Sequence, residues 1–106
     1  MGVLEDKIIV EIRLKYLVDI YISLASLSYA ADSARLKANL EQIILDVQLF
    51  GNDSQIAKAK EIVDNLVDRG QLEFRDLMHE VRNEVRSALS LSNRDDDVIF
   101  VKFNKQ

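Results

Sequence analysis

Residues 48–63, QLFGNDSQIAKAKEIV, decide the fold because they contain the sharpest break in the chain. Gly51 follows an apolar helical stripe, and we expect it to end that helix with a positive φ. Asn52 is a typical N-cap residue, and Gln55 stands three positions later, where its side chain can complete a capping box. The stretch therefore predicts the corner at which one helix ends and the next begins.

The same residues could instead hold a ligand at the start of the new helix, where free N–H groups attract anions. A phosphate loop of the Walker type has more glycines and a following Lys-Ser/Thr pair, which this stretch lacks. A calcium loop needs about five oxygen ligands at alternate positions, and the oxygen-bearing side chains here run out too early for that. We therefore interpret the stretch as a corner.

Apolar residues recur with helical spacing on both sides of this corner. Gly70 follows the downstream stripe, where a helix C-terminal glycine belongs. The stripes predict helices over residues 33–50, 53–69 and 71–91. Their members are Leu36, Leu40, Ile43, Ile44, Val47 and Phe50; Ile56, Ala59, Val63, Leu66 and Val67; and Phe74, Leu77, Met78, Val81, Val85, Ala88 and Leu89.

The first third of the chain admits two interpretations. Residues 10–16, VEIRLKY, alternate between apolar and polar like a half-buried strand. No turn signal interrupts the longer segment, however, and we expect one helix over about residues 4–31, with a break at Asp32-Ser33. Its core-facing residues would be Ile9, Ile12, Tyr16, Ile20 and Leu27.

This first helix has a second apolar face, which we interpret as a hypothetical interface. A helix that is apolar on most sides is central, covered by a second subunit, or in lipid. A membrane span needs about 20 apolar residues, whereas the uninterrupted run here, residues 20–31, has only twelve. We therefore expect no membrane span. The members of the second face are Leu14, Leu17, Val18, Tyr21 and Ala25.

Together these elements predict an all-α fold, an antiparallel up-and-down four-helix bundle over residues 1–92. The absence of proline and the presence of only three glycines agree with a helical chain. Residues 93–106, NRDDDVIFVKFNKQ, form an extended tail that is β-branched and aromatic enough to be a short strand. We expect the tail to dock on the bundle through Ile99, Val101 and Phe103.

Reactive groups are scarce. With one histidine and no cysteine, zinc and thiol chemistry have almost no ligands. The pair Asp76-x-x-His79 resembles half of a di-iron motif, but a second histidine is missing. The carboxylates of Asp95–Asp97 are typical of a solvated turn. We expect no enzyme activity, no metal site and no cofactor.

Charge patterns give one alternative function. The net charge of −4 argues against a bulk nucleic-acid binder. A basic stripe nevertheless runs along residues 71–91, and we expect it to pair with an acidic stripe on residues 53–69. If the hairpin turns the other way, Arg75, Arg82 and Arg86 form an outward ridge that could bind phosphates. The basic stripe is Arg75, His79, Arg82 and Arg86, and the acidic stripe is Glu61, Asp64 and Asp68.

The segments LFGNDSQI and LMHEVRNEVR give residues 14–91 a resemblance to a helical domain of uncharacterised bacterial proteins, some of them membrane-tethered. The resemblance implies a four-helix domain of unknown function, with no catalytic residues. The chain departs from this pattern in its tail after Ser92, and we expect no membrane anchor in it.

These observations predict a non-catalytic helical interaction module, homodimeric through its first helix. The partner would be a second copy or another protein, and membrane tethering could occur through that partner. The alternative is a small regulator that binds nucleic acid or another anion through Arg75, Arg82 and Arg86. The absence of cysteine favours a reducing compartment, such as a bacterial cytoplasm.

Overall fold

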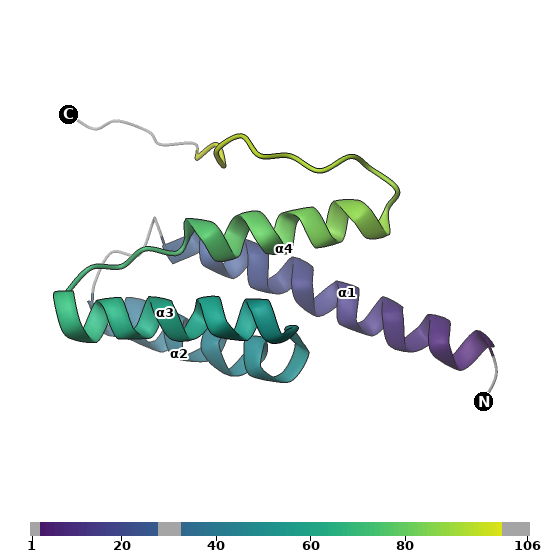
Figure 1. Ribbon diagram of the computed structural model, residues 1–106. Coiled ribbons are helices and arrows are strands. Elements are labelled where there is room, and N and C mark those ends of the chain that lie inside the picture. The colour runs from purple at the N-terminus through teal and green to yellow at the C-terminus, as the bar shows by residue number, and fades with distance from the viewer. Residues whose placement is uncertain (1–2, 28–32, 101–106) are drawn as a thin grey trace.

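The computed structural model describes residues 3–27 and 33–100 and shows an all-α bundle (Figure 1). Successive helices run in opposite directions, which confirms the predicted up-and-down arrangement. Among the described residues, α1 packs against α2 and α4, α3 packs against the same two helices, and α1 and α3 lie diagonally. The helices are α1 (Val3–Ser26), α2 (Ser33–Phe50), α3 (Asp53–Arg69) and α4 (Arg75–Ala88).

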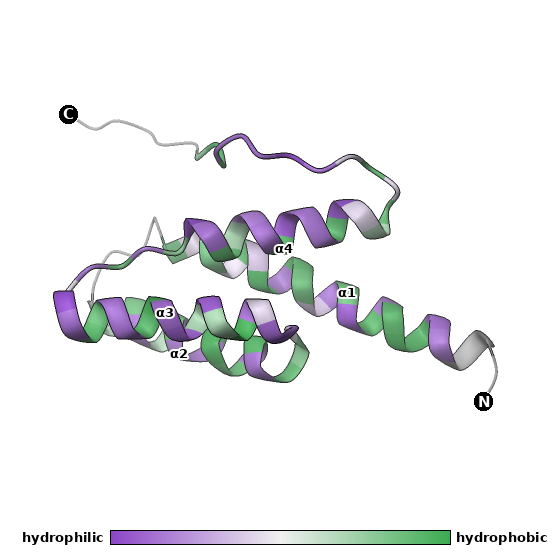
Figure 2. Cartoon of the chain, viewed as in Figure 1, coloured by the Kyte–Doolittle hydropathy of each residue, from purple (hydrophilic) through white to green (hydrophobic). Residues whose placement is uncertain are grey.

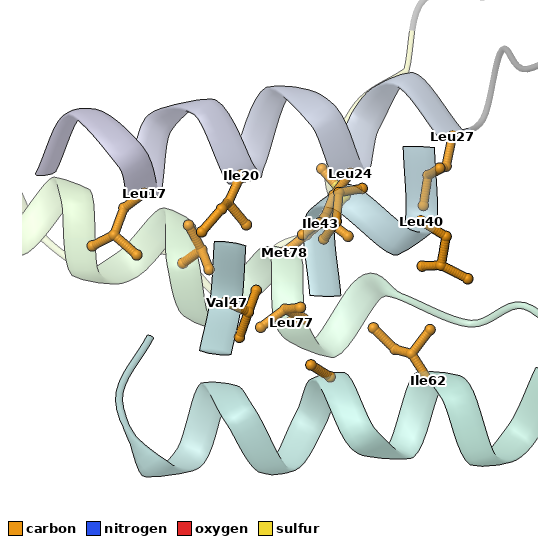
Figure 3. Close-up of a cluster of buried hydrophobic side chains, with 12 residues drawn as sticks. Leu17, Ile20, Leu24, Leu27, Leu40, Ile43, Val47, Ile62, Leu77 and Met78 are labelled. Carbon is orange, nitrogen blue, oxygen red and sulfur yellow. The ribbon is translucent and has the colours of Figure 1, made fainter. Parts of the chain in front are cut away.

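One hydrophobic core lies between the four helices (Figure 3). It contains the first part of the predicted stripe of α4, in which Leu77, Met78 and Val81 are fully buried, whereas Ala88 and Leu89 at the end of the stripe are exposed. Burying such side chains stabilises a fold by roughly 1.5–3 kcal/mol each. The buried apolar residues are Leu17, Ile20, Leu24, Leu27, Leu40, Ile43, Val47, Ala59, Ile62, Leu77, Met78 and Val81.

The structure confirms that residues 10–16 are helical, so the strand interpretation is wrong. The expected core face of α1 is only partly correct. Ile20 and Leu27 are buried, and Tyr16 stacks on Phe50 with the ring centroids 4.0 Å apart. Ile9 and Ile12 are exposed because the N-terminal half of α1 extends beyond the ends of the other helices (Figure 1).

The corner at residues 50–53 has the predicted capping box. The N–H of Gln55 donates to the Asn52 side chain at 2.8 Å, and the N–H of Asn52 donates to the Gln55 side chain at 2.9 Å. The expected positive φ of Gly51 is wrong, because Gly70 is the glycine that has one among the described residues. Gly51 is required for space instead, since a Cβ there would lie 2.6 Å from the carbonyl oxygen of Val47.

Gly70 ends α3 as predicted, with φ at 67° and its N–H donating to Leu66 O at 3.0 Å. The predicted start of α4 at residue 71 is four residues early. The Glu73 side chain accepts a 3.1 Å hydrogen bond from the N–H of Arg75, the first residue of α4. At the other end, Ser90 adopts a φ of 60°, which turns the chain out of the helix.

The described part of the tail, residues 90–100, runs back along α4 (Figure 1). It contains no strand within these residues. The last predicted residues of the first helix, 28–31, and the tail residues Val101 and Phe103 lie outside the described residues.

Candidate functional site

A polar cluster joins all four helices at the point where α1 leaves the bundle. The guanidinium of Arg13 in α1 forms an ion pair with Glu84 of α4, and its Nε donates to the Phe50 carbonyl at the end of α2 at 2.8 Å. The side-chain amide of Gln55 in α3 donates to Glu84 Oε1 at 2.6 Å. This cluster fixes the direction in which the rest of α1 projects.

The carboxyl group of Glu84 has a shifted pKa. Partial burial acts to raise the pKa, but the hydrogen bonds from Arg13 and Gln55 and the charge of Arg13 outweigh it, so the pKa lies below its ordinary value of 4.5. Glu84 is therefore ionised at neutral pH and holds its two donors.

Beyond this cluster, residues 6–12 of α1 form a projecting segment that carries hydrophobic residues (Figure 2), and the side chains of these residues are exposed. Ile8, Ile9, Val10 and Ile12 each keep between 47% and 61% of their surface exposed. Because a helix turns by about 100° per residue, Ile9 and Val10 flank the line of Leu17 and Leu24. The core stripe of α1 therefore continues past the end of the core.

The predicted interface residues of α1 divide into two groups. Leu17 is 1% exposed and belongs to the core, so its place in a hypothetical interface is wrong. Leu14, Tyr21 and Ala25 are half-buried, and Val18 is 38% exposed. The face is covered on one side by α4, which packs against α1.

The structure brings part of this face together with the predicted anion-binding residues. A groove of about 330 Å³, the α1–α4 groove, is lined by apolar side chains of both helices and by two arginines. Val18 and Tyr21 come from the predicted interface, and Arg82 and Arg86 come from the predicted basic ridge. The lining residues are Val18, Tyr21, Ile22, Arg82, Val85 and Arg86.

Both arginines of the groove bind the backbone of the tail. Arg82 Nη2 donates to the carbonyl of Asp96 at 2.6 Å and to the carbonyl of Arg94 at 3.3 Å. Arg86 Nε donates to the carbonyl of Ser92 at 2.8 Å. The tail therefore occupies the outer side of the ridge formed by Arg82 and Arg86.

One further hydrogen bond holds the tail in register. The N–H of Arg94 donates to the Asn83 side chain at 2.8 Å, and His79 Nε2 lies 3.9 Å from the Asp97 carboxylate. Within the tail, a hydrogen bond from Arg94 and the neighbouring positive charges lower the pKa of Asp96 to about 2. Asp96 is thus ionised beside Arg82, at 3.9 Å.

Arg75 does not join this site. It is exposed in the first turn of α4, about two turns before Arg82. Of the three predicted anion-binding residues, the structure brings together Arg82 and Arg86.

The expected charge pairing between the third and fourth helices is wrong. It is the acidic flank of α4 that faces α3, where Glu80 lies 3.2 Å from Lys58 and accepts a 2.7 Å hydrogen bond from Ser54. The basic stripe consequently points away from α3. The hairpin of α3 and α4 therefore turns in the direction that leaves the basic stripe facing outward. The tail covers Arg82 and Arg86 of this stripe.

Of the residues expected to dock the tail, Ile99 lies among the described residues, and its expected contact is wrong. Ile99 is 87% exposed, whereas Val98 and Phe100 are partly buried against the core. Side chains of an extended segment alternate between two faces, so a contact through Val98 and Phe100 turns Ile99 outward.

A larger apolar groove of about 840 Å³ lies between α2 and α3. Its two charged lining residues, Lys37 and Glu41, are exposed and lie 3.9 Å apart, and its other lining residues are apolar. The apolar lining residues are Leu36, Leu40, Ile44, Leu45, Val63, Leu66 and Val67.

Over residues 3–27 and 33–100, no group of three or more His, Asp or Glu side chains is placed to hold a metal ion. The described helices include none that is both long and apolar enough to cross a membrane. No protein-family model, no curated protein and no solved structure matches the chain.

The polar cluster was not predicted from the sequence. One of its members, Arg13, was detectable as a charged residue on an otherwise apolar face, because it lies four residues from both Ile9 and Leu17. Glu84 and Gln55 gave no signal of this kind, since both occur at positions where a solvated or capping side chain is equally expected.

Proposed function

We propose that the protein is a non-catalytic helical module that acts by protein–protein association, as a homodimer formed through α1. The observation that carries this proposal is the exposure of Ile8, Ile9, Val10 and Ile12 on a helix that projects beyond its own bundle. A run of exposed apolar side chains is typical of an interaction surface.

The charges around the projecting segment support a second copy as the partner. Asp6, Ile9, Val10 and Arg13 follow helical spacing of i, i+3, i+4 and i+7, so they share one face. In an antiparallel pair of such segments, Ile9 of one copy packs on Val10 of the other, and Asp6 faces Arg13. The side chain of Arg13 is 34% exposed beside Glu84, so it can also contact Asp6 of the second copy.

The expected dimer is weak. Because full burial of an Ile or Val side chain gains roughly 1.5–3 kcal/mol, the half-exposed Ile9 and Val10 of both copies give roughly 4 kcal/mol in total. Association costs at least about 4 kcal/mol in lost freedom. The two terms nearly cancel, so a dimer with a Kd near 1 mM depends on the charge pairs between Asp6 and Arg13.

Sedimentation equilibrium tests this proposal over protein concentrations from about 10 µM to about 2 mM, a range that brackets such a Kd. We expect the mean mass to rise towards twice the monomer mass. Ile9→Glu with Val10→Glu should keep the protein monomeric, whereas Leu49→Glu, the matched control at an exposed leucine of α2, should not. A monomer mass throughout, or equal dimerisation of both variants, would contradict the proposal.

The alternative function, an anion-binding regulator that uses Arg75, Arg82 and Arg86, has less support. Arg82 and Arg86 already donate to tail carbonyls, and Arg75 lies apart from them. A reducing compartment such as a bacterial cytoplasm fits the absence of cysteine in the sequence.

A further inference from the structure

We propose that the α1–α4 groove is a second binding surface, which takes an acidic peptide segment with apolar residues, and that residues 92–100 compete for it. This surface is separate from the projecting segment, so the proposal does not depend on homodimerisation. The tail shows which ligand chemistry the site binds, since Arg82 and Arg86 donate hydrogen bonds to three of its carbonyl oxygens.

The arginines have donors left for a ligand. A guanidinium has five N–H donors, and the described contacts of Arg82 to the tail use Nη2 alone. Arg82 Nε is buried without a hydrogen-bond partner. A carboxylate suits these donors better than a backbone carbonyl does, because charge-assisted hydrogen bonds are about twice as strong as neutral ones.

The apolar floor of the groove favours a ligand that has an apolar side chain next to the carboxylate bound by the arginines. Val18, Tyr21 and Ile22 of α1 and Val85 of α4 line it, and Ile22 remains exposed while the tail is in place. Apolar side chains beside two guanidiniums are complementary to a segment in which acidic and apolar residues adjoin. The tail itself has this composition, in Asp95–Asp97 followed by Val98 and Ile99.

The tail is bound in a way that permits displacement. Its hydrogen bonds to Arg82, Arg86 and Asn83 lie in exposed positions, where water replaces them at little net cost. The carboxylates of Asp96 and Asp97 lie 3.9 Å from Arg82 Nη2 and His79 Nε2, which is beyond hydrogen-bond distance. Most of its hold on the bundle therefore comes from Val98 and Phe100, which pack against the core.

A peptide partner fits these observations better than a nucleic acid does. Two arginines converge at the groove, whereas a nucleic acid is bound through many phosphate contacts. The chain as a whole carries a net charge of −4, which repels a long polyanion.

Fluorescence anisotropy tests the proposal with the full chain and a labelled peptide of the sequence LSNRDDDVIF, residues 91–100. Val98→Ser with Phe100→Ser releases the chain's own tail, and this variant should bind the peptide at least about tenfold more tightly than the unaltered chain, because a tethered competitor acts at millimolar effective concentration. Binding that is absent, or equal in the two proteins, would overturn the proposal.

Two controls separate the site from other causes. In the released variant, Arg82→Gln with Arg86→Gln should abolish binding, and Arg86→Gln alone should weaken it, whereas Arg75→Gln, the same change outside the groove, should leave it unchanged. A peptide with Asn at the three Asp positions should bind more weakly. Equal binding of the peptide by the Arg82/Arg86 variant and the Arg75 variant would overturn the proposal. Tighter binding of a single-stranded RNA than of the peptide would also overturn it. Neither outcome depends on whether the homodimer is found.

Discussion

The side-chain amide of Gln55, in the first turn of α3, donates a 2.6 Å hydrogen bond to the Glu84 carboxylate of α4. The same carboxylate is paired with Arg13 of α1, which also donates to the last carbonyl of α2. Through Arg13 and Gln55, the Glu84 carboxylate thus connects all four helices. These contacts also hold α1 at the point from which it projects. The corner residue Gln55 serves both the capping box and this cluster.

Gln55→Ala should lower the free energy of unfolding by about 2–3 kcal/mol, because it removes a cap interaction and a buried partner of a charged group. Gln55 is 1% exposed, so its truncation leaves a cavity beside the Glu84 carboxylate. Urea denaturation measures the change. Gln48→Ala is the matched control, since Gln48 is exposed and bonds only to Ile44 of its own helix. Equal losses for the two variants would show that the cluster adds no stability.

The stability of the protein should depend on pH through Glu84. Because its pKa is lower in the folded state than the ordinary 4.5, its contribution is present above pH 4.5 and is lost as the pH falls through the folded pKa. Glu84→Gln should therefore be less stable than the unaltered protein at neutral pH, and the difference should shrink in acid.

Urea midpoints at several pH values below neutral measure this difference. Glu41→Gln serves as the control, because Glu41 forms an exposed pair with Lys37 at 3.9 Å, which adds little stability. A gap between Glu84→Gln and the unaltered protein that stays constant down to the lowest pH would mean that Glu84 does not titrate as described.

The sequence predicted the fold because each helix end and each core stripe is a local pattern. The corner at Asn52 and Gln55 and the end at Gly70 depend on residues within one turn of each other, and they were confirmed. The direction in which α3 and α4 turn was not predictable, because both directions give plausible charge contacts. Tertiary packing of Leu77, Met78 and Val81 against the core decided it.

The candidate site was predictable in its parts and not as a whole. Val18 and Tyr21 were expected in an interface and Arg82 and Arg86 on a basic ridge, but only the packing of α1 on α4 places them in one groove. Helical spacing alone cannot show where a helix extends past its neighbours. For that reason Ile9 was assigned to the core. Leu17 was assigned to the interface because α1 is apolar on two faces, and the spacing does not show which of them is buried.

The two glycines at helix ends should respond differently to alanine. At Gly51 a Cβ would lie 2.6 Å from the backbone oxygen of Val47, so Gly51→Ala must shift the corner itself. At Gly70 the space is open and the cost is the positive φ, about 1 kcal/mol. We expect Gly51→Ala to be the more destabilising in thermal unfolding, and the reverse order would show that the corner adjusts easily. Gly70→Asn should recover part of the loss, because asparagine tolerates this conformation.

The adjacent residues Leu17 and Val18 should differ in their effect on the free energy of unfolding. Leu17 is fully buried, so Leu17→Ala should lower the free energy of unfolding by about 2–5 kcal/mol through lost burial and the cavity it leaves. Val18 is 38% exposed at the edge of the α1–α4 groove, so Val18→Ala should cost less than about 1 kcal/mol. Urea denaturation at a low protein concentration measures both values without a contribution from dimers. If Val18→Ala proved as destabilising as Leu17→Ala, the outer face of α1 would be packed in solution, and the groove would not be open to a ligand.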